Sequence, residues 1–129
     1  MIILFGSQKG GVGKSTLCSN LAVFLAKEKK DVLLLDCDSQ ATLSRWASDR
    51  EGFEIQPPIE CLKKSGNIAP TLEALKKKYR YILCDTAGRD SQELRTGLLR
   101  SDVFITPVRP SQADLDTLFH LEEMVEEAL

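Results

Sequence analysis

The sequence predicts an α/β fold in which a mostly parallel β-sheet carries helices on both faces. Short, almost wholly apolar runs recur along the chain, and such runs suit strands that are buried on both faces of a sheet. Segments with apolar residues at helical spacing lie between these runs, and this alternation of strands and helices indicates parallel pairing. Strands are expected at residues 2–5, 32–35, 81–84 and 103–108, with a weaker one at 53–56, and helices at 17–30, 40–48, 71–78, 91–99 and 113–129.

Each element has its own local evidence. The first apolar run is closed by Gly6, a turn residue, and a glycine-rich stretch separates it from the first helix. That helix ends in lysines, and cations are favourable at a helix C-terminus because of the helix dipole. The runs at 32–35 and 81–84 are each followed by aspartate, so two strands deliver carboxylates at their C-terminal ends.

Length and composition predict one domain over residues 1–129, because a chain of this size supports a single core and no biased segment divides it. The chain has 17 Lys and Arg against 19 Asp and Glu, a formal net charge of −2. This balance excludes a molecule that is basic overall, so any contact with nucleic acid or anionic membrane must come from a local patch.

The four cysteines form no CxxC pair, which favours free, buried thiols in a reducing compartment over disulfides or metal ligands. The apolar N-terminus has no basic lead-in and is soon broken by Gly6, so neither a signal peptide nor a membrane span is expected there. We therefore expect a cytoplasmic protein. The final helix ends in glutamates without a glycine cap, which predicts that the natural chain continues beyond residue 129.

The sequence GGVGKS at residues 10–15 lies between a predicted strand and a predicted helix, which is the context of a phosphate-binding P-loop. Glycines let the backbone curl so that N–H groups and the helix N-terminus face a phosphate. Lys14 is expected to reach the terminal phosphates, and the Ser15 hydroxyl is expected to bind Mg²⁺. One departure from the usual loop is Gln8, which stands where a glycine is common and is followed by Lys9.

With its early lysine, the stretch KGGVGKST at residues 9–16 resembles the deviant Walker A box of the ParA and MinD superfamily. The resemblance implies a P-loop NTPase fold that binds ATP or ADP with Mg²⁺. It also implies a homodimer that encloses two ATP molecules, with Lys9 reaching the partner's phosphates as an arginine finger does elsewhere. The implied nucleotide-binding residues are Lys9, Gly10, Gly11, Val12, Gly13, Lys14, Ser15 and Thr16, of which Lys9 and Lys14 are also catalytic.

The two aspartate-bearing strand ends supply the remaining candidate residues. The segment DCDSQ at 36–40 looks like the family's DxDxQ segment, which implies that Asp38 positions or activates the attacking water. Asp36 is expected near Mg²⁺, although spacing alone does not divide the roles of these two carboxylates. Asp85 fits a Walker B aspartate that holds a magnesium-bound water, and residues 86–88 fit a switch that senses the terminal phosphate. The expected metal-site residues are Ser15, Asp36, Asp38 and Asp85.

The segments at residues 85–91 and 107–116 look most like those of plasmid and chromosome partition ATPases. This resemblance implies a weak ATPase that is stimulated by a centromere-binding partner and binds non-specific DNA as an ATP-dependent dimer at the nucleoid. It also implies that the chain lacks C-terminal elements of the family. Three alternatives stay open: a membrane-associated spatial regulator like MinD, an iron protein like nitrogenase reductase, and a small-molecule kinase or ligase.

Overall fold

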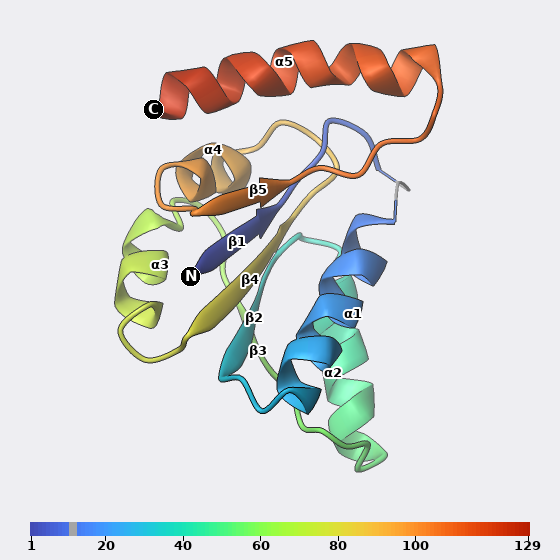
Figure 1. Ribbon diagram of the computed structural model, residues 1–129, viewed down its shortest axis with the longest axis vertical. Helices are drawn as coiled ribbons and strands as arrows, with labels where there is room; N and C mark the ends of the chain where they lie inside the picture. The colour runs from blue at the N-terminus through green and yellow to red at the C-terminus, as the bar shows by residue number, and fades with distance from the viewer. Residues whose placement is uncertain (11–12) are drawn as a thin grey trace.

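The computed structural model describes residues 1–10 and 13–129, and strands alternate with helices along the chain (Figure 1). The described strands form one five-stranded sheet in the order β3-β2-β4-β1-β5, with every neighbouring pair parallel. The strands are β1 (Ile2–Phe5), β2 (Val32–Cys37), β3 (Glu60–Lys63), β4 (Tyr81–Thr86) and β5 (Val103–Ile105). The helices are α1 (Lys14–Lys27), α2 (Thr42–Gly52), α3 (Ala69–Leu75), α4 (Gln92–Leu98) and α5 (Gln112–Ala128).

Helices cover both faces of this sheet, as the alternating pattern predicts. On one face, α1 and α2 pack Cys18, Ala22 and Leu43 against side chains of β1, β2 and β4. On the other face, α3, α4 and α5 supply a second apolar cluster, and Figure 1 shows α5 running alongside α4. The fold class predicted from the sequence is therefore confirmed.

The central strands place the candidate site residues at the C-terminal ends of the strands, on one side of the sheet. Strands β1, β2 and β4 are buried almost throughout, which explains why their sequences are continuous apolar runs rather than alternating ones. The register pairs Asp36 of β2 with Asp85 of β4, and Phe5 of β1 also pairs with Asp85. The loop after β1 therefore begins beside the Asp85-bearing end of β4 and one strand away from the Asp36-bearing end of β2. These are the strand ends at which ligands bind in open parallel sheets.

The strand expected at residues 53–56 is wrong. Phe53 is 79% exposed, and Glu54 has a φ of 52°, a left-handed conformation that does not continue a strand. The edge strand is β3 instead, and most of its residues are exposed, so its sequence has no apolar run to mark it. At the other edge, β5 ends at Ile105 rather than at residue 108, because Pro107 has no N–H to donate to a ladder.

All four cysteines are free thiols, as the sequence predicts. Cys18, Cys37 and Cys84 are buried, whereas Cys61 on the edge strand is only half-buried, so the expectation of burial is wrong for that residue. Even this partial burial raises the pKa of the Cys61 thiol to about 11. Within the described residues, no helix has both the length and the apolar character needed to span a bilayer.

Candidate functional site

The candidate site is built first by the connection from β1 to α1. Gly13 stands at the N-cap of α1 with a φ of +85°, a conformation that only glycine adopts without strain. No side chain caps this end of α1, so its first N–H groups can serve a bound anion. Gly10 and Gly13, both predicted to bind phosphate, thus lie in the connection between β1 and α1. Gly11 and Val12, both expected to bind phosphate, lie outside the described residues.

The segment after β4 packs directly on this loop. A Cβ atom on Gly88 would lie 2.6 Å from the Gly10 Cα atom and 2.7 Å from its backbone nitrogen. These distances are shorter than any Cβ contact that packing tolerates, so the two backbones approach as closely as a glycine allows. Residues 86–88 are the predicted sensor of a terminal phosphate, and Gly88 lies against the loop; the sensing role itself stays a prediction.

Lys14, Ser15 and Asp85 form a compact polar group beneath the loop. The Lys14 Nζ atom donates to one carboxylate oxygen of Asp85 at 2.6 Å, and the Ser15 hydroxyl donates to the other at 2.7 Å. Asp85 is fully buried, and Lys14 is only 6% exposed. Burial raises the pKa of the Asp85 carboxyl, while Lys14 and Ser15 act in the opposite direction by favouring the charged form. The buried Asp85 carboxylate therefore interacts mainly with Lys14 and Ser15, and with a ligand where one is bound.

The two carboxylates of the 36–40 segment have different environments. Asp36 is buried and accepts hydrogen bonds from the backbone N–H and hydroxyl of Ser44, at 2.9 and 2.8 Å, and from the backbone N–H of Asp38 at 3.1 Å. Among the described residues, the Asp38 carboxylate accepts a hydrogen bond only from the backbone N–H of Gln40, at 3.0 Å, and the residue remains half-buried. The structure thus distinguishes two residues that spacing alone leaves equivalent. Both carboxylate oxygens of Asp36 accept hydrogen bonds from the protein, whereas one oxygen of Asp38 accepts none from the described residues.

A cavity of about 450 Å³ opens between these segments. It is lined by Lys9, Gly10, Gly13, Lys14, Ser15, Thr16, Asp38, Ser39, Gln40, Thr42, Ala87, Gly88 and Arg89. Asp36 instead lines a neighbouring cavity of about 410 Å³, together with Asp38 and two lysines. A larger cavity of about 790 Å³ between α2 and β3 contains none of the predicted site residues, so its size alone does not make it the site.

The expected metal-site residues do not all converge. Among the residues that the structure describes, no group of three or more His, Cys, Asp or Glu side chains is arranged to hold a metal ion. Ser15 and Asp85 are in direct contact, while Asp36 is turned toward Ser44. Hydroxyl and carboxylate oxygens suit Mg²⁺, which generally binds through one or two protein oxygens, water and substrate phosphates. The Ser15–Asp85 pair fits that description.

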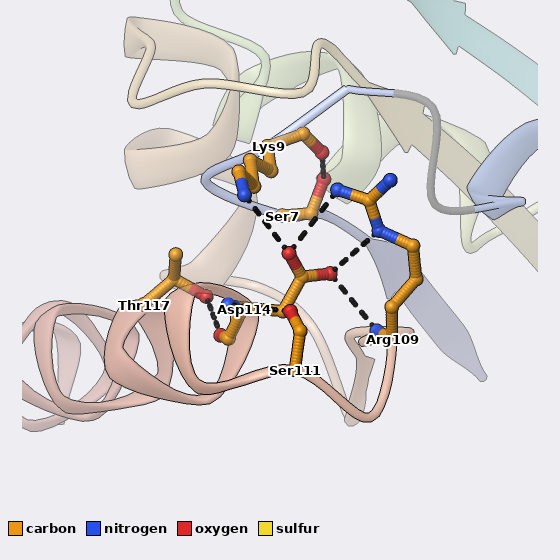
Figure 2. A network of polar contacts seen from close by, with 6 residues as sticks. All are labelled: Ser7, Lys9, Arg109, Ser111, Asp114 and Thr117. Atoms are coloured by element: carbon orange, nitrogen blue, oxygen red, sulfur yellow. Dashed lines mark hydrogen bonds and ion pairs between the residues drawn. The ribbon is translucent and has the colours of Figure 1, made fainter.

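Lys9 lies at the rim of the site and contacts a residue that sequence reasoning missed. Its Nζ atom is 3.1 Å from the Oδ1 atom of Asp114, near the start of α5 (Figure 2). The same carboxylate accepts hydrogen bonds from the backbone and side chain of Arg109, which hold the pKa of Asp114 well below its usual range, with Lys9 adding to the effect.

Asp114 and Ser44 contact predicted site residues but were not themselves predicted. Asp114 lies in a recognisable pattern, since the Ser111 hydroxyl caps α5 by accepting the Asp114 N–H at 3.2 Å, as expected of a Ser-x-x-Asp helix start. That pattern marks the helix but does not reveal that the carboxylate turns toward Lys9. Ser44 has no sequence signal at all, because its role depends on how α2 is placed against β2.

A model of the CobQ/CobB/MinD/ParA nucleotide-binding domain matches residues 3–127. Protein virC1 of Rhizobium radiobacter is 31% identical over 120 residues, covering 89% of this chain and 52% of that protein. Protein ParA of Rhizobium radiobacter is 28% identical over 113 residues, covering 88% of this chain and 50% of that protein.

Among solved structures, a plasmid partition protein of Borrelia burgdorferi B31 bound to AMPPNP superposes with a TM-score of 0.83 at 25% identity, covering 98% of this chain and 70% of that one. The chain spans about half the length of the two curated relatives, virC1 and ParA of Rhizobium radiobacter. The matched model extends over nearly the whole chain, and the solved structure just described has the same fold. The chain belongs to the family of CobQ, CobB, MinD and ParA nucleotide-binding domains.

Proposed function

We propose that this chain binds ATP with Mg²⁺ and hydrolyses it as the nucleotide-binding part of a plasmid or chromosome partition protein. The observation that carries the proposal is the buried group of Lys14, Ser15 and Asp85 beneath a glycine-bounded loop. A nucleotide-bound plasmid partition protein with the same fold supports the choice of ligand and of process.

The residues present fit a nucleoside triphosphate. The Lys14 ammonium and the open N-terminus of α1 supply positive charge and N–H donors for phosphate oxygens. In the proposed complex, Lys14 moves from Asp85 to the terminal phosphates, and the Ser15 hydroxyl and Asp85 are the residues that would hold Mg²⁺. Bound Mg²⁺ would neutralise charge that develops on the transferred phosphoryl group.

Asp38 is the residue that we propose to orient the attacking water. It lines the cavity, and one of its carboxylate oxygens accepts no hydrogen bond from the part of the chain that the structure describes, whereas both oxygens of Asp36 accept hydrogen bonds from the protein. A general base must be within hydrogen-bond reach of the proton that it takes, directly or through one water. We therefore assign the catalytic role to Asp38 and keep for Asp36 only an indirect, water-mediated place near Mg²⁺.

The action of the whole protein is also a proposal, because this chain spans about half the length of its curated relatives. In this proposal two subunits associate when ATP is bound, and Lys9 of each completes the partner's site. The ATP-bound dimer binds non-specific DNA at the nucleoid, and a centromere-binding protein stimulates a weak hydrolysis. No observation favours a membrane-associated regulator or an iron protein over this function.

The test is binding of the full-length gene product to non-specific duplex DNA, measured with Mg²⁺ and either ATP or ADP. We expect binding with ATP only, and loss of that binding in Lys9→Ala and in Lys14→Ala. Lys27→Ala is the matched control, since it removes an exposed lysine at the far end of α1. If the intact protein binds ATP but not DNA, the partition assignment is wrong, and liposome binding and iron content become the relevant measurements.

A further inference from the structure

We propose that the groove between α2 and the open edge of β3 docks an extended, basic segment of a partner protein, which joins the sheet as an additional strand. This groove is the cavity of about 790 Å³ described above, and none of the residues predicted for the nucleotide site lines it. The proposal goes beyond the proposed function and does not depend on it, because docking in this groove requires no ATP.

The groove runs along the edge of β3 and is walled by α2. All four residues of β3 line it, together with residues of the segment that connects α2 to β3. The side chains of successive strand residues point to opposite faces of a sheet, so a cavity lined by the whole strand lies along its edge rather than over one face. Four residues of the α2 wall lie at the spacing of a single helix face: Ser44, Ala47, Ser48 and Glu51.

The backbone of β3 is open on the side of the groove. Within the described residues, β3 ends the sheet and pairs only with β2. The N–H of Lys64, directly after β3, donates to the Asp36 carbonyl of β2 at 3.1 Å. Because backbone groups alternate in direction along a strand, those of Cys61 and Lys63 point to the open edge. An extended segment in the groove can pair with these groups, as peptides do when they add a strand to a sheet edge.

The volume and the apolar lining also suit a polypeptide segment. A cavity of about 790 Å³ is within the range of ligand sites, and the serines and the alanine of the α2 wall leave room beside the strand. Ile55 and Leu62 line the groove and are 45% and 47% exposed, so an occupant that covers them removes apolar surface from water. We therefore expect apolar residues at alternate positions of the docked segment, because every second side chain of a strand faces the same way.

The charges of the groove favour a basic segment. Its ionisable residues are Glu51, Glu54, Glu60, Arg50 and Lys63. In the described part of the chain, none of the three glutamates forms an ion pair. Arg50 is turned toward its own chain, since its Nη2 donates to the Pro57 carbonyl at 2.8 Å and its guanidinium lies 5.1 Å from the centroid of the Trp46 ring. Carboxylates thus outnumber the available cations, and complementary charge selects for Lys or Arg in the partner.

The first test selects peptides on the immobilised full-length protein without nucleotide, from a phage-displayed random library of about eight residues, a length that exceeds a typical strand. We expect enriched sequences that alternate apolar and polar residues and carry Lys or Arg. Ser48→Trp should abolish binding of a synthetic peptide with the most enriched sequence, because the indole fills the groove. Asp49→Trp is the matched control, since Asp49 is the next, exposed residue of α2 and does not line the groove. The proposal is wrong if no sequence or only acidic sequences are enriched, or if Ser48→Trp binds the peptide normally.

A second pair of variants tests pairing with the strand itself. Lys63→Pro removes the N–H that points to the open edge and leaves the bond of Lys64 to β2 in place, so we expect the affinity for the peptide to fall about tenfold. Lys63→Ala keeps that N–H and removes a cation from the groove, so it should bind the basic peptide at least as well as the unmodified protein. Equal affinities in Lys63→Pro and Lys63→Ala would show that the peptide does not pair with β3, and the proposal fails.

Cys61 reports on the groove in the unmodified protein, where no variant can disturb the fold. It is half-buried and the other three cysteines are buried, so an alkylating reagent should modify it first. Saturating peptide should slow this modification, and an unchanged rate would place the peptide elsewhere and overturn the proposal. A second copy of the chain is the other possible occupant. If light scattering shows that the nucleotide-free protein self-associates, and Ser48→Trp but not Asp49→Trp prevents this, the groove joins two copies and the proposed partner is wrong.

Discussion

Gly88 is the residue at which the segment after β4 touches the phosphate loop. We expect Gly88→Ala to lower the affinity for ATP about fivefold to a hundredfold, because the new Cβ would overlap the Gly10 backbone and overpacking costs about 1–3 kcal/mol. Titration with a fluorescent ATP analogue measures the affinity, and circular dichroism checks that the fold is retained. Gly52→Ala is the control, since a Cβ there meets nothing within 4 Å and alanine favours a helix. Equal affinities in the two variants would show that the loop does not need this close approach.

At the scale of elements, hydrogen bonds from Ser44 to the Asp36 carboxylate connect the end of β2 to the first turn of α2. Ala41 stands at the N-cap of α2 without a side-chain cap, and Asp36 at the end of β2 accepts the Ser44 N–H in the first turn instead. We expect Asp36→Ala to lower the free energy of unfolding by about 1–3 kcal/mol, because it leaves donors in the part-buried turn unpaired. Urea denaturation measures the change.

Ser44→Ala is the matched control for this connection. It removes the hydroxyl but keeps the backbone hydrogen bond to Asp36, so its effect should be smaller than that of Asp36→Ala. If Asp36→Ala leaves stability unchanged and abolishes only Mg²⁺-dependent turnover, then Asp36 serves the metal rather than the connection.

The whole molecule should be more stable with its ligand bound. A ligand that binds only the folded state at a hundred times its dissociation constant adds about 2.7 kcal/mol to the free energy of unfolding. We therefore expect Mg²⁺ and ATP to raise the midpoint of thermal unfolding, and we expect Lys14→Ala to abolish most of this shift. Lys27→Ala should keep it. If Mg²⁺ and ATP raised the unfolding midpoint of Lys14→Ala as much as that of the unmodified chain, ATP would bind away from the loop between β1 and α1.

Much of the fold was predictable because its central strands are buried on both faces. Burial on both faces demands continuous apolar runs, and β1, β2 and β4 carry them. Edge strands need no continuous apolar run, so the sequence predicts a strand at 53–56 in place of β3 and predicts a β5 that is three residues too long. The site was predictable in part for a related reason: parallel strands end at the same edge, which brings Asp36 and Asp85 together with the loop after β1.

The sequence by itself determined the fold class and predicted a phosphate loop, because apolar runs and a Gly-rich segment before a helix are local patterns with local physical causes. Only the tertiary structure decided that Asp36 is bound by Ser44 while Asp38 faces the cavity, and that Lys9 rests on Asp114. These contacts join residues of different elements, up to 105 positions apart in the Lys9–Asp114 pair. The geometry of these contacts depends on how the helices pack against the sheet, and that packing cannot be read from the spacing of residues along the chain.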